Sequence, residues 1–78
     1  MRKIQELEAK PDFTLAVIFD NGVKKIVDCK PYLKFPVFQV LKDGLNFNAV
    51  RNCGYYIEWS PYEIDLSADT LWADGRQV

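Results

Sequence analysis

The residues that could do chemistry gather toward the C-terminal end of the chain, where several carboxylates follow one another: Glu58, Glu63, Asp65 and Asp69. Such a group could bind a hard cation, and a pair of carboxylates could act as general acid and base. The spacing argues against both roles, because a turn containing Pro61 follows Glu58 and no loop offers alternating oxygen ligands with a glycine at the bend. We therefore expect solvated or helix-capping acids, with no metal and no cofactor.

Cys29 and Cys53 are the remaining candidate nucleophiles. The chain has no His, which is the commonest general base and metal ligand. A reactive thiolate needs a nearby cation or helix N-terminus, and only Lys30 adjoins Cys29. The cysteines also lack the CxxC spacing of zinc ribbons and redox pairs. We expect both to stay reduced and to pack as small apolar residues, and we expect no enzymatic activity and no catalytic residues.

Large aromatic residues crowd the same end of the chain: Tyr55, Tyr56, Trp59, Tyr62 and Trp72. A domain of 78 residues buries only about 60% of the surface that its unfolded chain exposes. Some of these side chains must therefore remain near the surface, where Tyr and Trp are typical of protein interfaces. The sequence predicts a partner-binding surface with aromatic anchors and an acidic rim, formed by Tyr56, Glu58, Trp59, Tyr62 and Glu63.

The charge balance narrows the kind of partner. The chain has 10 Lys and Arg against 11 Asp and Glu, and residues 53–78 contain five acids and one base. Nucleic-acid readers carry a basic stripe interleaved with aromatics, whereas here the aromatics lie in the acidic third. We expect a protein partner or self-association, and no direct binding of nucleic acid.

The start of the chain has no signal-like apolar run, and no segment approaches the ~20 apolar residues of a membrane span, so we expect a cytoplasmic protein with no membrane contact.

The first half of the chain predicts a three-stranded antiparallel meander. Residues 13–19 are apolar on both faces, which is typical of a central strand covered on both sides. The Asn21-Gly22 pair favours a tight hairpin into a β-rich run over residues 23–29. Residues 4–9 are expected to pair with the other side of the central strand as an edge.

Helical and strand patterns alternate in the second half. Pro36 and the apolar residues three and four positions apart after it, Phe38, Leu41 and Leu45, predict a short helix. Asp43-Gly44 interrupts this helix, and Asp43 could cap a second helical turn. Strands are expected at 55–59 and 62–66, after a turn at 52–54. Ser67 is a suitable N-cap for a helix over 68–72, and residues 74–78 are expected to fray.

These elements predict a single small α+β domain over residues 1–78. Its sheet is mainly antiparallel and consists of two hairpin or meander units, with one or two short helices between and after them. The expected core is Phe13, Leu15, Val17, Phe19, Phe38, Leu41, Phe47, Val50, Ile57 and Leu71.

The order of segments resembles a small bacterial family known as domain of unknown function 2442. The resemblance spans nearly the whole chain and rests on the Pro11-Asp12-Phe13 turn, the Asp20-Asn21-Gly22 hairpin and the Ile57-Glu58-Trp59 strand, together with the stretches around Pro36 and Leu41. It implies a compact α+β domain that stands alone or precedes a DNA-binding domain, often in a toxin-antitoxin-like gene arrangement. The family offers no catalytic residues to transfer.

Two functions from different classes follow. The first is a non-catalytic protein-interaction module, the antitoxin-like or regulatory member of a small gene pair. The alternative is a DNA-linked regulatory domain that acts through a partner or a fused DNA-binding domain.

Overall fold

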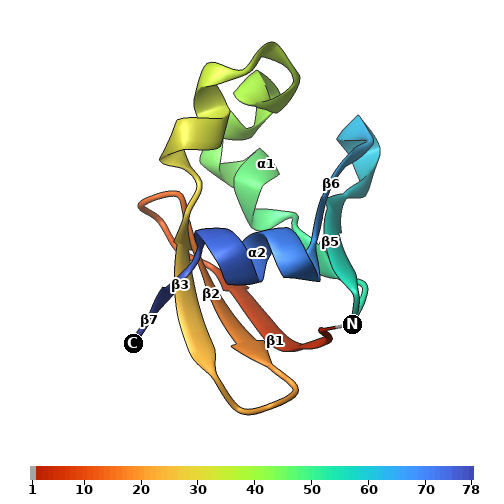
Figure 1. The fold of residues 1–78 in the computed structure, drawn as a ribbon. Coiled ribbons are helices and arrows are strands. Elements are labelled where there is room, and N and C mark those ends of the chain that lie inside the picture. Colours follow the sequence, from red (N-terminus) through yellow and green to blue (C-terminus); the bar gives the residue numbers. More distant parts are fainter. Residues whose placement is uncertain (1) are drawn as a thin grey trace.

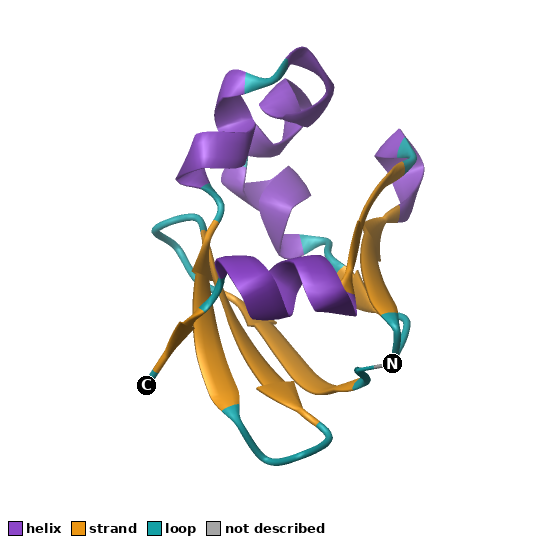
Figure 2. Ribbon diagram, in the orientation of Figure 1, coloured by secondary structure: helices purple, strands orange, loops and turns teal. Residues whose placement is uncertain are grey.

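The computed structural model describes residues 2–78 and arranges their strands in two antiparallel sheets (Figures 1 and 2). The larger sheet has the order β1-β2-β3-β7, with bounds Ile4–Ala9, Thr14–Phe19, Lys24–Asp28 and Arg76–Gln77. The smaller sheet has the order β4-β5-β6, with bounds Arg51–Asn52, Tyr56–Trp59 and Ile64–Ser67. The α+β class and the antiparallel arrangement are confirmed.

Short helical segments connect the two sheets and follow the second one. The connection contains the 3₁₀ helices η1 (Lys30–Lys34) and η2 (Pro36–Lys42) and the helix α1 (Gly44–Asn48). The 3₁₀ helix η3 (Ser60–Tyr62) joins β5 to β6, and α2 (Ala68–Asp74) follows β6. Figure 1 shows α2 lying across one face of the larger sheet, with the η1–η2–α1 segment above it and the β5–β6 hairpin to one side.

Local hydrogen bonds explain where these elements begin. The Asp43 side chain accepts from the backbone N–H of Leu45 at 2.9 Å, and the Ser67 hydroxyl accepts from that of Thr70 at 3.0 Å. Each satisfies one of the backbone donors that a helix leaves unpaired at its first turn. Both predicted N-caps are confirmed.

The predicted meander is also confirmed, with β2 between β1 and β3. Gly22 has φ 85° in the β2–β3 turn, a conformation that glycine adopts at little cost. The side chain of Asn21 accepts from the Val23 N–H at 3.0 Å. The Asn21-Gly22 pair therefore forms the tight turn of the β2–β3 hairpin, as the sequence predicted.

The core lies between the inner face of the larger sheet, the helical segments and the smaller sheet. Most of its predicted members are buried, namely Leu15, Val17, Phe19, Leu41, Phe47, Ile57 and Leu71. Phe13, Phe38 and Val50 are half-buried and pack against them. The buried set also includes Cys29, as expected, and residues that the sequence analysis did not select, namely Ile4, Val27, Leu33, Trp59, Ile64 and Ala68.

The expected fraying of residues 74–78 is wrong. Arg76 pairs with Ile26 and Gln77 with Lys25, so β7 adds a short edge strand to the larger sheet. Gly75 permits this close approach, because a Cβ there would lie 2.9 Å from the Lys25 Cβ and 2.8 Å from the Leu71 carbonyl oxygen. The predicted turn at 52–54 begins one residue too early, since Asn52 belongs to β4.

No helix in residues 2–78 is both long enough and apolar enough to cross a membrane.

Candidate functional site

The outer face of the smaller sheet carries a cross-strand row of charges. Glu58 on β5 lies opposite Arg51 on β4 and Asp65 on β6. Arg51 forms an ion pair with Glu58, and the hydrogen bond and charge of Glu58 raise the pKa of Arg51. Two carboxylates directly opposite each other would repel, so the guanidinium relieves that repulsion. Glu58 is thus partly screened from a partner, whereas Asp65 is exposed.

Tyr56 lies one row away on this outer face, opposite Ser67, with its carbonyl accepting from the Cys53 N–H at 2.9 Å. The neighbouring Cys53, and to a smaller extent the charge of Glu58, raise the pKa of Tyr56. Its side chain is 43% exposed, and that of the preceding Tyr55 is 50% exposed. Two consecutive tyrosines therefore offer large amphipathic side chains to solvent.

Trp59 does not belong to this surface, and its prediction as a surface anchor is wrong. The side chain is 1% exposed, its Nε1–H donates to the Phe47 carbonyl oxygen at 2.9 Å, and its ring lies 6.0 Å from that of Phe47. The reason is the alternation of a strand: Trp59 shares a face with Ile57, and that face packs inward. The indole is a structural part of the core.

The other two predicted members of the surface lie at the tip of the hairpin. Tyr62 is half-buried and donates its hydroxyl hydrogen to the Asn46 side-chain oxygen at 2.7 Å. This bond ties the tip of the β5–β6 hairpin to α1. Glu63 follows it with φ 55° and is exposed, so it is the unobstructed acid of the tip.

The carboxylates near the C-terminal end do not gather at one site, although Glu58 and Asp65 lie opposite each other. Asp69 pairs with Arg2 at 3.3 Å, Glu58 pairs with Arg51, and Glu63 lies at the hairpin tip. Within the described part of the chain, no group of three or more His, Cys, Asp or Glu residues could hold a metal ion. The ring of Trp72 already contacts two cations of the chain. The guanidinium of Arg2 lies 4.3 Å and the ammonium of Lys25 4.0 Å from its ring centroid.

Cys29 is buried and Cys53 is half-buried, and both are free thiols. Burial, with a smaller contribution from the charge of Asp28, raises the pKa of Cys29 to about 12. A thiol with this pKa is protonated at neutral pH, and the thiolate is the nucleophilic form. Cys29 is therefore set up for packing and not for nucleophilic attack.

The pKa of Cys29 predicts a loss of stability in alkali. The folded pKa of about 12 exceeds the ordinary value of 9.0, so between these values the folded state binds more protons than the unfolded state. Stability is therefore expected to fall as pH rises through this window. Urea unfolding between pH 7 and 11 should show a shallower decline for Cys29→Ala than for wild type, while Val37→Ala, a change at an exposed residue that does not titrate, should follow the wild-type slope. Equal slopes for the two variants would contradict this assignment.

A second set of apolar side chains is exposed around the connection between the sheets: Phe35, Val37 and Leu45. Leu45 is 83% exposed at the start of α1, and it lines a hollow with Pro11 and Phe13 of the β1–β2 turn. The sequence analysis did not select these residues, because the spacing of apolar residues alone does not show which side of an interrupted helix faces water.

Sequence reasoning also missed the exposure of Tyr55, which directly precedes β5, and the place of Arg51 on the outer face of the smaller sheet. Tyr55 was recognised only as one of several surplus aromatics. Arg51 became relevant only when β4 paired with β5, a contact that the predicted turn at 52–54 did not include. Tyr56 and Glu63 are exposed, as an interaction surface requires.

Comparisons with known proteins agree with the resemblance noted from the sequence. No curated protein and no solved structure matches the chain. The family model described as "Protein of unknown function (DUF2442)" matches residues 4–77. Since this match covers nearly the whole chain, the protein belongs to the DUF2442 family.

Proposed function

We propose that the protein is a non-catalytic interaction module whose contact surface is the outer face of the smaller sheet together with the exposed Tyr55 just before β5. The observation that carries the proposal is the exposure of two consecutive tyrosines, 50% for Tyr55 and 43% for Tyr56. Tyrosines of this kind bury much apolar area on binding while the hydroxyl keeps a hydrogen bond. We call Tyr55, Tyr56, Glu63 and Asp65 the tyrosine surface.

The expected partner is a protein with a basic contact surface. Asp65 lies opposite Glu58 on the outer face and Glu63 at the tip of the same hairpin, and both are exposed. Residues 53–78 contain five acids and one base. Exposed charges of this kind speed association with an oppositely charged partner, and added salt weakens the effect. Glu58 contributes less, because Arg51 already pairs with it.

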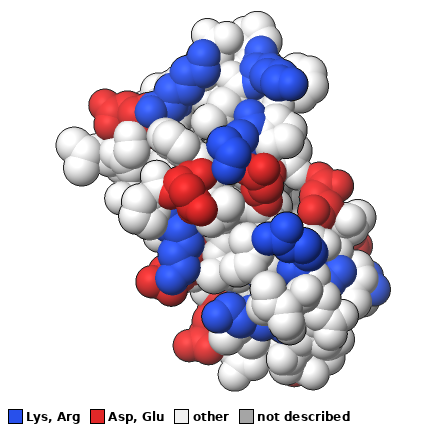
Figure 3. Space-filling view, turned by 90° about the vertical axis from the view of Figure 1, so that its left-hand side faces the viewer, with Lys and Arg blue, Asp and Glu red and all other residues white. Residues whose placement is uncertain are grey.

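Direct recognition of nucleic acid is the less favoured alternative. Figure 3 shows acidic and basic side chains intermixed on the side that it displays, whereas nucleic-acid readers gather bases along one face. The family resemblance supports a finer proposal: a regulatory or antitoxin-like member of a bacterial gene pair, acting in the cytoplasm. A DNA-linked role would then be exercised through a partner or a fused domain.

The proposal predicts a large effect of truncating the tyrosines. The tagged full-length chain, purified from its source cell, should retain a stoichiometric partner, whose affinity can then be measured by calorimetry. Tyr56→Ala should weaken that affinity by ~2 kcal/mol, roughly thirtyfold, and raising the salt concentration should weaken wild-type binding.

Matched variants decide which surface is used. Lys34→Ala changes an exposed residue of η1, outside the tyrosine surface, and should leave the affinity unchanged. Leu45→Ser tests the apolar side chains of the connection. If Leu45→Ser abolishes binding while Tyr55→Ala and Tyr56→Ala leave it intact, the tyrosine surface is not the contact surface.

A further inference from the structure

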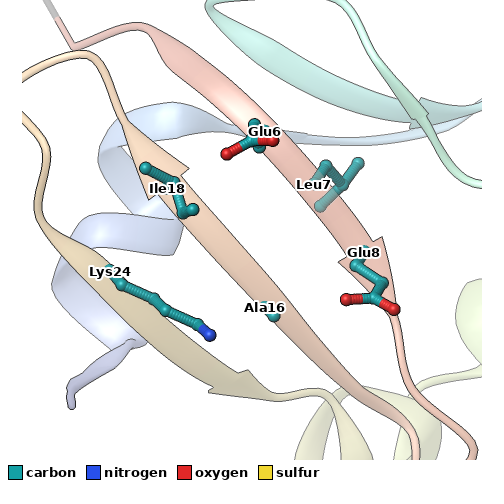
Figure 4. A pocket seen from close by; sticks show the side chains of 6 residues that line it. All are labelled: Glu6, Leu7, Glu8, Ala16, Ile18 and Lys24. Carbon is teal, nitrogen blue, oxygen red and sulfur yellow. The ribbon is translucent and has the colours of Figure 1, made fainter.

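The outer face of the larger sheet has an apolar centre that no described element covers. Ala16 and Ile18 on β2 and Ile26 on β3 share this face, as the register of the two strands shows. Figure 4 looks onto it, with α2 behind the sheet and the side chains of Ala16 and Ile18 in front. Ala16 is 7% exposed, and Ile18 and Ile26 are half-buried.

The sequence of β2 indicates that this face is meant to be covered. Five of the residues in Thr14–Phe19 are apolar, on both faces of the strand. Strands of this composition are typical of sheets buried on both sides, whereas a sheet with one solvated face alternates apolar and polar residues. The helix α2 and the core cover only the inner face, so among residues 2–78 no helix or strand packs on the apolar centre of the outer face.

Charges of opposite sign flank this apolar centre on its two sides. Glu6 pairs with Ile18, and Ile18 pairs with Lys24, which makes one row from acid through apolar to base. The next row runs from Glu8 through Ala16 and Ile26 to Arg76 on β7. Figure 4 shows Glu6 and Glu8 along β1 and Lys24 on β3, all bordering the same hollow. We call Glu6 and Glu8 the acidic column, and Lys24 and Arg76 the basic column.

The partners of these charges within the chain are few. Glu8 forms an exposed ion pair with Lys10 at 3.0 Å, which is worth little in water. Among residues 2–78, Glu6, Lys24 and Arg76 form no ion pair. Asp28, paired with Lys30 at 3.0 Å, is the next outer-face residue of β3 after Ile26, and the charge of Arg76 contributes to lowering its pKa after hydrogen bonds with Lys30. Most of the charge in both columns is therefore available to a second molecule.

We propose that a second copy of this chain covers the outer face of the larger sheet in a two-fold symmetric dimer. A two-fold axis parallel to the strands lays the acidic column of one copy on the basic column of the other, twice over, with the apolar centres in contact. An in-plane axis perpendicular to the strands would place acid on acid and base on base. The face is therefore self-complementary in one orientation, as a closed two-fold interface requires.

This inference does not rest on the proposed function, because it concerns a different sheet and needs no other protein. The footprint is small: four strands about 4.8 Å apart and about five residues long give on the order of 300 Å² per copy. Stable complexes bury ~800 Å² per partner. We therefore expect a weak dimer with a dissociation constant on the order of 100 µM.

A charge-reversal experiment tests the orientation directly. In Glu6→Lys/Glu8→Lys both columns are positive, and in Lys24→Glu/Arg76→Glu both are negative. By sedimentation from about 20 µM to about 1 mM, each variant alone should self-associate at least about tenfold more weakly than wild type. An equimolar mixture should form a heterodimer with an affinity within about threefold of the wild-type homodimer, because opposite columns again face each other.

Two further measurements keep the proposal falsifiable if a variant folds poorly. Circular dichroism checks each fold, and Glu63→Lys/Asp65→Lys serves as a control that makes the same charge change on the smaller sheet and should dimerise like wild type. In an NMR dilution series of wild type, the concentration-dependent amide shifts should lie on β1, β2 and β3. A monomeric wild type at about 1 mM, shifts confined to the smaller sheet, or a mixture that does not associate would each overturn the proposal.

Discussion

Replacing Val17 by Asp is expected to give a protein that does not fold. Val17 is 0% exposed in the middle of β2, where Leu7 on β1 and Lys25 on β3 are its cross-strand neighbours. A carboxylate there would be buried without a partner, which costs at least several kcal/mol. Because the whole stability of a small domain is about 5–15 kcal/mol, we expect loss of the β-sheet signal in circular dichroism and no cooperative melting transition.

The neighbouring position supplies the matched control. Ile18 lies on the outer face of the same strand, so Ile18→Asp places the same carboxylate where water reaches it. This variant should stay folded, with a melting temperature lower by a few degrees. If Val17→Asp melted like wild type, or if Ile18→Asp alone unfolded the protein, the assignment of the two faces of β2 would be wrong.

Truncating Trp59 is expected to have the second-largest effect, and to act on stability and not on recognition. Trp59→Ala removes a 1%-exposed indole and leaves the Phe47 carbonyl without the donor that it has at 2.9 Å. Replacing a buried Trp or Phe by Ala typically costs about 3–5 kcal/mol. Urea denaturation should therefore show a large fall in the midpoint, or no folded baseline.

Tyr56→Ala is the comparison for this prediction. Its side chain is 43% exposed, so its truncation should change the free energy of unfolding by no more than about 1 kcal/mol. Trp59→Ala with wild-type stability, or Tyr56→Ala as the more destabilised of the two, would contradict the burial of one residue and the exposure of the other.

The parts of the fold that the sequence predicted are those determined by nearby residues. The Asn21-Gly22 turn sets the β2–β3 hairpin, because glycine adopts positive φ readily. Asp43 and Ser67 begin α1 and α2, because each accepts a hydrogen bond from a backbone N–H two or three residues further along. Signals of this kind can be read without knowing what lies elsewhere in the chain.

The parts that could not be predicted depend on distant contacts. β7 exists because Gly75 lets the chain pass close to Lys25, fifty residues earlier in sequence. Phe13 was expected inside a strand, yet it lies in the preceding turn with φ 62°. Its ring packs edge-on against Phe47 at 5.3 Å, a long-range contact that can hold an aromatic residue in this unusual conformation.

The candidate site divides in the same way. Strand alternation predicts Tyr55, Ile57 and Trp59 on one face and Tyr56 and Glu58 on the other. Ile57 and Trp59 are buried together as this division requires, whereas Tyr55, which precedes β5, is 50% exposed. Which face would be buried depends on the packing of Phe47 against Trp59, and the sequence does not contain that information locally. The prediction of Tyr56, Trp59 and Tyr62 as anchors is therefore wrong for Trp59, which lies in the core, and stays a prediction for the two tyrosines.

Oxidative footprinting of the purified partner complex tests most directly whether the tyrosine surface is the contact surface. Hydroxyl radicals modify exposed aromatic and aliphatic side chains, so the free chain should be labelled at Tyr55, Tyr56 and Leu45, which are 50%, 43% and 83% exposed. In the complex we expect Tyr55 and Tyr56 to be protected severalfold while Leu45 is labelled as in the free chain. Protection of Leu45 with unchanged labelling of both tyrosines would contradict the account.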